Sequence, residues 1–140
     1  MTDALLAIDD LGDDLDAVLR WAIEFKRLWK SGDEVVLNFM PLDTLTVGCI
    51  YEKPSTRTRV SFEVGIDRLG GNPLTLLKND IQLGTSETVS DTAKVLSRFL
   101  GAITYRCYAH ADVTELAESA EVPVINALSD KHHPLSLVHI

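Results

Sequence analysis

From residue 44 onward, short apolar stretches typical of strands alternate with segments whose apolar residues recur at helical spacing. The stretches that predict strands are 45–51, 73–77, 102–105 and 123–127, and those that predict helices are 58–69, 89–100 and 112–120. Strands that alternate with helices form a parallel sheet through right-handed crossovers. The alternation therefore predicts an α/β domain with a parallel sheet of about four strands and helices on both faces.

The part of the chain before this alternation predicts helix instead. Between residues 3 and 30, apolar residues recur three and four positions apart, which indicates one helix or two. Residues 31–33, Ser-Gly-Asp, are typical of a helix end. Residues 33–43 contain Pro41 and predict no regular element. With 140 residues in all, the chain is expected to form one domain, residues 1–140.

Charge and composition argue against several classes of function. The formal net charge of −8 disfavours nucleic acid or an anionic membrane surface as the main partner. No apolar run approaches the length that spans a bilayer, and no signal-peptide pattern follows Met1, so a cytoplasmic protein is expected. Cys49 and Cys107 lie in or beside apolar stretches and are predicted to be buried, without a chemical role.

The run 55–59, Ser-Thr-Arg-Thr-Arg, stands between the first predicted strand and the helix that follows it. Free backbone N–H groups at a helix start bind anions, and this run adds three hydroxyls and two guanidinium groups to them. An isolated arginine there would be interpreted as solvated surface. Two arginines bracketed by hydroxyls, with Lys53 beside them in an acidic protein, favour a site for a small phosphate-bearing molecule.

Polar residues follow the other three predicted strands as well. They are residues 78–82 after the second strand, Arg106 and His110 after the third, and 129–136 after the fourth. Because ligands bind beyond the carboxyl ends of parallel strands, we expect these loops to converge on one edge of the sheet. His110 and Asp112 are interpreted as a helix start, with Asp112 as its cap.

The segment 54–59, followed by Ser-Phe-Glu, resembles the carbamoyl phosphate signature shared by aspartate and ornithine carbamoyltransferases. The ornithine enzymes are favoured, because the aspartate enzymes usually lack Lys53 and tend to carry lysine where this chain has Gln82. The segments that resemble the ornithine enzymes are 52–54, 80–84, 87–88, 91–98, 122–128 and 133–134. The resemblance covers nearly the whole chain and implies the carbamoyl phosphate-binding domain of that family.

The resemblance also implies roles for single residues. Those expected to bind carbamoyl phosphate are Ser55, Thr56, Arg57, Thr58, Gln82, Arg106, His133, Pro134 and Ser136. Arg57, Arg106 and His133 are the implied catalytic residues, and Arg106 and His133 are expected to reach the carbamoyl oxygen. Gln82 is expected to enter the site of a neighbouring subunit, because the family forms homotrimers. The backbone of Leu128 is expected to contact L-ornithine.

The implied reaction converts carbamoyl phosphate and L-ornithine to L-citrulline and phosphate, within arginine metabolism. It requires positioning of two reactants and donors for developing charge, which Arg57 and Arg106 can supply. No cofactor or metal is expected. His132 and His133 are adjacent, while the other histidines are remote in sequence and form no ligand set.

Two departures from the family pattern leave alternatives open. Where the family has His-Pro-Cys-Gln, this chain has His133-Pro134-Leu135-Ser136, and the shorter serine is expected to weaken binding. The family's chains are about twice as long, so residues 1–140 are expected to lack the ornithine-binding domain. Two other candidates remain. One is a non-catalytic carbamoyl phosphate-binding or assembly module, and the other is a carbamoyltransferase with another amine acceptor.

Overall fold

The computed structural model describes residues 4–84 and 86–132. Across these residues, five strands form one sheet in the order β1-β5-β4-β2-β3, and every neighbouring pair is parallel. The strands are β1 (Ala4–Leu5), β2 (Thr46–Tyr51), β3 (Asn72–Leu77), β4 (Ala102–Arg106) and β5 (Val124–Leu128). The predicted α/β class and the parallel sheet are confirmed, and the predicted strand number of about four is corrected to five.

The extra strand, β1, lies in the segment for which helix was predicted. Ala4 and Leu5 pair with Val124 and Ile125 of β5. The Asp10 carboxylate then accepts hydrogen bonds from the backbone N–H groups of Leu6 and Ala7, at 2.7 and 2.8 Å, and so turns the chain out of the strand. Two residues are too few to show the period-two pattern by which strands are recognised in a sequence.

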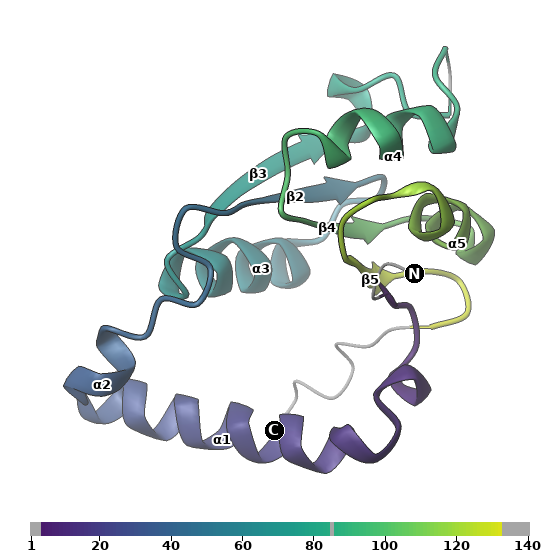
Figure 1. The fold of residues 1–140 in the computed structure, drawn as a ribbon. Coiled ribbons are helices and arrows are strands. Elements are labelled where there is room, and N and C mark those ends of the chain that lie inside the picture. The colour runs from purple at the N-terminus through teal and green to yellow at the C-terminus, as the bar shows by residue number, and fades with distance from the viewer. Residues whose placement is uncertain (1–3, 85, 133–140) are drawn as a thin grey trace.

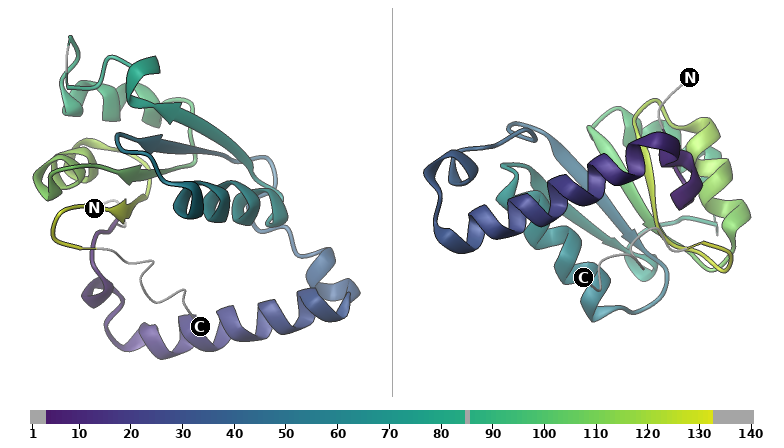
Figure 2. Two further views of the ribbon diagram at one scale, coloured as in Figure 1. Left: turned by 180° about the vertical axis from the view of Figure 1, so that it is seen from behind. Right: turned by 90° about the horizontal axis from the view of Figure 1, so that it is seen from below.

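Helices connect the strands and cover both faces of the sheet (Figures 1 and 2). They are η1 (Ile8–Asp14), α1 (Leu15–Ser31), α2 (Glu34–Leu37), α3 (Thr56–Arg68), η2 (Lys78–Asp80), α4 (Val89–Ser97) and α5 (His110–Ser119). Helix α3 packs on one face of the sheet, and α4 and α5 lie against the other. Helix α3 begins two residues earlier than predicted, which places Thr56 and Arg57 in its first turn.

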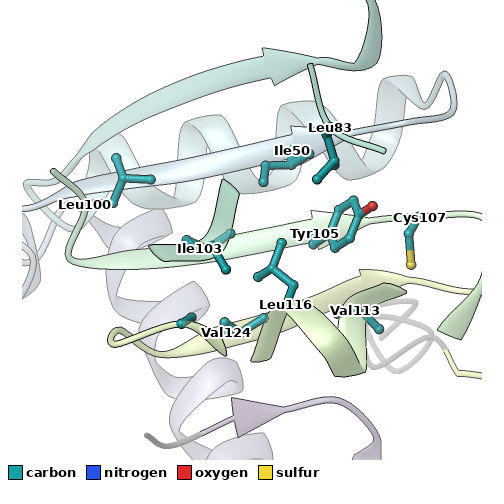
Figure 3. Close-up of a cluster of buried hydrophobic side chains, with 11 residues drawn as sticks. Ile50, Leu83, Leu100, Ile103, Tyr105, Cys107, Val113, Leu116 and Val124 are labelled. Atoms are coloured by element: carbon teal, nitrogen blue, oxygen red, sulfur yellow. The ribbon is translucent and has the colours of Figure 1, made fainter. Parts of the chain in front are cut away.

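Strand β2 divides its side chains between two apolar clusters, as period-two alternation requires. Val47, Cys49 and Tyr51 pack with Ile66 of α3. Ile50 points to the other face, into a cluster built from β4, β5, α4 and α5 (Figure 3). Tyr105 and Leu116 are among the largest fully buried side chains of that second cluster. Burial on both faces fixes the register of β2. The register in turn determines the position of residue 52, which directly follows the carboxyl end of β2.

Helix α1 is set apart from the sheet (Figure 1). None of its side chains is buried, and Trp21 and Ile23 are 63% and 55% exposed. Its carboxyl end approaches the rest of the chain, where Phe25 stacks on Phe39 and the Arg68 guanidinium lies 4.7 Å from the Trp29 ring centroid. Gly32 ends α1 in the left-handed conformation, at φ 72°, as its sequence predicts. Among the described residues, no helix combines the length and the apolar character needed to span a bilayer.

Candidate functional site

The amino end of α3 lies at the carboxyl end of β2. Ser55 caps the helix from an extended conformation, and its Oγ accepts a hydrogen bond from the Thr58 N–H at 3.2 Å. A helix offers no acceptor to its first N–H groups, so those of Thr56 and Arg57 are available to an anion. Both of these residues are exposed. We call residues 55–58 the cradle.

Arg106 reaches the cradle from the neighbouring strand. In the register of β2 and β4, Arg106 lies opposite Tyr51. Its Nη1 donates to Oγ1 of Thr58 at 3.1 Å, and Thr58 is only 6% exposed. The Arg106 Nε is buried and has no acceptor within the described residues. Burial lowers the pKa of Arg106, an effect that Tyr51 partly opposes. Arginine stays protonated at neutral pH even so, and its unmatched N–H group is a donor for a bound oxyanion.

The second arginine of the run is engaged differently. Arg59 donates from Nε to Glu63 at 2.8 Å, and Glu63 also accepts a hydrogen bond from the Thr75 hydroxyl. The Thr75 bond and then the Arg59 bond hold the pKa of Glu63 below its ordinary value. The carboxylate correspondingly raises the pKa of Arg59. Arg57, by contrast, is exposed and has its side chain outside this pair. Arg59 lines the cavity beside the cradle, whereas Arg57 and Arg106 are not among its lining residues.

A cavity of about 530 Å³ opens beside the cradle. The residues lining it are Tyr51, Glu52, Lys53, Pro54, Ser55, Thr56, Arg59, Val60, Leu77, Lys78 and Asn79. They come from the ends of β2 and β3 and the start of α3, with three cationic side chains among them. A small anion is the ligand that this lining favours, although the protein as a whole is acidic.

Contacts among Glu52, Lys78 and Tyr108 connect the ends of three strands. The sequence predicted no role for these residues. The Glu52 side chain is 6% exposed and accepts hydrogen bonds from Lys78 Nζ at 3.2 Å and from the Tyr108 N–H at 3.0 Å. Its own N–H donates to the Arg106 carbonyl at 2.9 Å. Lys53 and Lys78 both place their ammonium groups near the Tyr108 ring, 5.1 and 5.6 Å from its centroid. The loops after β2, β3 and β4 therefore converge, as predicted.

The loop after β5 brings Leu128 to the same edge of the sheet. Leu128 pairs with Arg106, and its carbonyl accepts from the Cys107 N–H at 3.0 Å. His133, Pro134 and Ser136 lie outside the described residues, so their predicted roles stay predictions. Gln82 lies in the exposed loop after η2, where its side chain accepts from Ser86 Oγ at 2.8 Å. It does not line the cavity described above.

The predicted cap of α5 is wrong. The helix begins at His110, with Ala109 in the capping position and no capping side chain there. The carboxylate of Asp130, from the loop after β5, accepts from the His110 N–H at 2.7 Å instead. A cap supplied from 20 residues away has no local sequence signal, and the local sequence favours the nearest acidic residue, Asp112, instead.

The two cysteines are both buried and unpaired, as predicted. Burial, followed by the negative charge of Glu52, raises the pKa of Cys107 to about 11. Burial raises the pKa of Cys49 as well. Neither thiol is therefore a nucleophile at neutral pH. In the part of the chain that the structure describes, no His, Cys, Asp and Glu side chains gather in a metal-binding arrangement.

Comparison with known proteins identifies the family of this chain. Residues 4–138 match the profile described as the aspartate/ornithine carbamoyltransferase carbamoyl-P binding domain. A catabolic ornithine carbamoyltransferase from Thermoplasma volcanium is 48% identical over 134 residues, which are 96% of this chain and 42% of that protein. The ornithine carbamoyltransferase from Methanopyrus kandleri is also 48% identical, over 95% of this chain and 42% of its own length.

Solved structures agree with the sequence relatives. The ornithine carbamoyltransferase from Pyrococcus furiosus matches with a TM-score of 0.87 and 46% identity, over 94% of this chain and 41% of that one. A mitochondrial ornithine carbamoyltransferase from Coccidioides immitis matches with a TM-score of 0.89 and 39% identity, over 99% and 44%. The chain thus spans about two fifths of the length of these relatives. It belongs to the aspartate/ornithine carbamoyltransferase family and corresponds to the carbamoyl phosphate-binding domain of that family.

Proposed function

We propose that this chain binds carbamoyl phosphate at the cradle and forms the carbamoyl phosphate half of an ornithine carbamoyltransferase site. The observation that carries the proposal is the Arg106 side chain. One of its N–H groups bonds Thr58 of the cradle, and its Nε is buried without a protein acceptor. A buried cationic donor without a partner costs free energy unless a ligand oxygen completes it.

In the proposed complex, the phosphate oxygens accept hydrogen bonds from the backbone N–H groups of Thr56 and Arg57 and from the Arg57 guanidinium. They also accept from the hydroxyls of the cradle, which belong to Ser55, Thr56 and Thr58. Arg106 donates toward the carbamoyl oxygen and the bridging oxygen. His133 and Ser136 are proposed to contact the carbamoyl group, with Pro134 between them in sequence. Ser136 carries one hydroxyl where the family's glutamine has an amide, so this end of the ligand is held less firmly.

The proposed reaction begins with attack by the neutral δ-amine of L-ornithine on the carbamoyl carbon. Negative charge develops on the former carbonyl oxygen, close to the donors of Arg106 and His133. The bond from the carbamoyl carbon to the phosphate oxygen then breaks, phosphate leaves, and the amine loses a proton to give L-citrulline. Donors aimed at the developing charge contribute about 100- to 1,000-fold in rate each.

Ornithine recognition and assembly complete the proposal. Leu128 lies opposite Arg106 and offers its backbone to L-ornithine, with the remaining contacts supplied by the part of the relatives that extends beyond this match. Gln82, on its exposed loop, is proposed to enter the neighbouring site of a homotrimer. The setting is cytoplasmic arginine metabolism. The chain could serve either arginine biosynthesis or arginine breakdown, and the name of the Thermoplasma volcanium relative, a catabolic ornithine carbamoyltransferase, supports breakdown.

Calorimetric titration with carbamoyl phosphate tests the site. We expect Arg57→Ala to weaken binding at least tenfold, because a charge-assisted hydrogen bond contributes about 1.5–3 kcal/mol. Arg98→Ala is the matched control, since Arg98 is an exposed arginine at the end of α4, before the amino end of β4. Equal affinity for the Arg57→Ala variant and the unmodified chain would rule out the assignment of the cradle.

An activity assay separates the functional candidates. The chain is incubated with carbamoyl phosphate and L-ornithine, and citrulline is measured. Citrulline formation supports a transferase. Carbamoyl phosphate binding without citrulline supports the non-catalytic module. A product formed only with another amine supports a different acceptor.

A further inference from the structure

The Glu52 side chain completes the hydrogen bonding between β2 and β4 at the point where the two strands part. In a parallel pair, a residue donates from its N–H to one residue of the partner strand, and its carbonyl accepts from the residue two positions further on. The Glu52 N–H donates to the Arg106 carbonyl at 2.9 Å, so the Glu52 carbonyl would next accept from Tyr108. The Tyr108 N–H donates instead to Glu52 Oε2, at 3.0 Å. The carboxylate therefore takes the place of the backbone carbonyl.

This replacement releases the backbone after Glu52 from the sheet. A Glu52 carbonyl bonded to Tyr108 would keep the two chains extended side by side for a further residue. With the side chain as the acceptor, the backbone is free to turn, and Ser55 caps α3 three residues later. Glu52 thus holds Arg106 through its N–H and stands directly before the turn that leads to the cradle.

Lys78 balances the charge of the buried carboxylate. The Glu52 side chain is 6% exposed, and Lys78 Nζ, at the start of η2, lies 3.2 Å from Oε1. A buried charge is stable where it is paired and hydrogen-bonded. Each carboxylate oxygen has its own donor, Lys78 for Oε1 and Tyr108 for Oε2. The side chain is therefore fixed between the ends of β2, β3 and β4.

We propose that Glu52 is a positioning residue, which sets the cradle and Arg106 at the separation that lets both contact one molecule of carbamoyl phosphate. This rests on the proposed function, in which the cradle binds the phosphate and Arg106 donates toward the carbamoyl and bridging oxygens. Glu52 lines the cavity, but a carboxylate repels an anion, so it is not a group that binds the ligand. It acts through the backbone on either side of the site.

Charge and geometry make opposite predictions for two substitutions of Glu52. Glu52→Asp keeps the negative charge, but the side chain is one methylene shorter and no longer reaches the Tyr108 N–H. Glu52→Gln loses the charge but has the same length and keeps an oxygen that accepts from Tyr108. Lys78 is 44% exposed, so its ammonium can turn to solvent in that variant. If Glu52 acted through its charge, Glu52→Asp would bind like the unmodified chain and Glu52→Gln would bind an anion more tightly.

Calorimetric titration of the 140-residue chain with carbamoyl phosphate is the test. We expect Glu52→Asp to weaken binding about tenfold, the equivalent of one lost hydrogen bond, and Glu52→Gln to be no more than about twofold weaker. Urea denaturation without ligand checks that folded chains are compared. Unchanged affinity in Glu52→Asp, or an equal loss in Glu52→Gln, overturns the positioning role. An unmodified chain that does not bind carbamoyl phosphate would contradict the proposed function instead.

Substitution of Tyr108 tests the same hydrogen bond from its donor and keeps the test valid if Glu52→Asp does not fold. Tyr108 follows β4 and is 54% exposed. Tyr108→Pro removes the N–H that Glu52 accepts, whereas the matched control, Tyr108→Ala, keeps the N–H and removes only the ring. We expect Tyr108→Pro to weaken carbamoyl phosphate binding as Glu52→Asp does, and Tyr108→Ala to stay within about twofold of the unmodified chain. Equal affinity of the two Tyr108 variants would show that this bond does not position the site.

Discussion

The hydrogen bond between Arg106 and Thr58 can be removed without changing the shape of either residue. Thr58→Val replaces the hydroxyl by a methyl group of similar size. The guanidinium then loses the acceptor of its Nη1, while its Nε already has none within the described residues. A hydrogen bond to a charged group contributes about 1.5–3 kcal/mol, and Arg106 is only partly buried, so we take the lower end.

We therefore expect the free energy of unfolding to fall by about 1.5 kcal/mol in Thr58→Val, measured by urea denaturation without ligand. Carbamoyl phosphate affinity should also fall, because the hydroxyl is a proposed phosphate donor. Thr92→Val is a matched control. Thr92 is buried to the same extent, and its hydroxyl bonds Glu87 on the α4 side of the sheet, away from the cradle. If Thr58→Val unfolds at the same urea concentration as the unmodified chain, the Arg106 contact does not stabilise the fold. A loss of ligand affinity in Thr92→Val would show that the affinity change is not local.

Three further predictions follow from particular contacts. The pKa of Glu63 is lowered in the folded chain, so its ionised form stabilises the fold above the unfolded pKa, and this stabilisation is lost as the pH falls through the folded pKa. Glu63→Gln should therefore lower the midpoint of urea unfolding at pH 7 and lower it much less at pH 3. An equal reduction at both pH values would contradict the pairing. Helix α1 has no buried side chain, so its amides should exchange with deuterium well before those of β2 and β4, and equal protection would contradict its exposed position. Burial raises the pKa of Cys107 to about 11, so a thiol reagent at pH 8 should label Cys107 only after urea unfolding, and rapid labelling of the folded chain would be the opposite result.

The sequence predicted the parts of the site that depend on local signals. An apolar β-branched stretch followed by a turn rich in hydroxyls indicates a strand and then a helix, and the structure has β2 and α3 there. The cap by Ser55, which starts α3 two residues before the predicted start, was not predicted. Arg106 was predicted as a strand-end residue. Its contact with Thr58 depends on the register between β2 and β4, which pairs residues 55 positions apart.

The unpredicted features depend on contacts between distant residues. The Asn126 amide bonds Leu6, 120 positions away, and nothing around Asn126 in the sequence indicates that partner. Glu52 is bonded by Lys78 and Tyr108 for the same reason. Helix α1 shows the opposite case. Its apolar spacing predicted a helix correctly, but spacing alone does not say against which element such a helix packs.

A nuclear magnetic resonance titration with carbamoyl phosphate tests the central claim most directly. The signals observed are the backbone N–H groups of Thr56 and Arg57 and the Arg106 Nε–H, with labelled protein and increasing ligand. If carbamoyl phosphate binds at the cradle, these signals shift together and saturate, and the Arg106 Nε–H shows the change expected of a new acceptor. If they stay unchanged while signals near Phe25 and Trp29 shift, the ligand binds elsewhere and the proposed site is wrong.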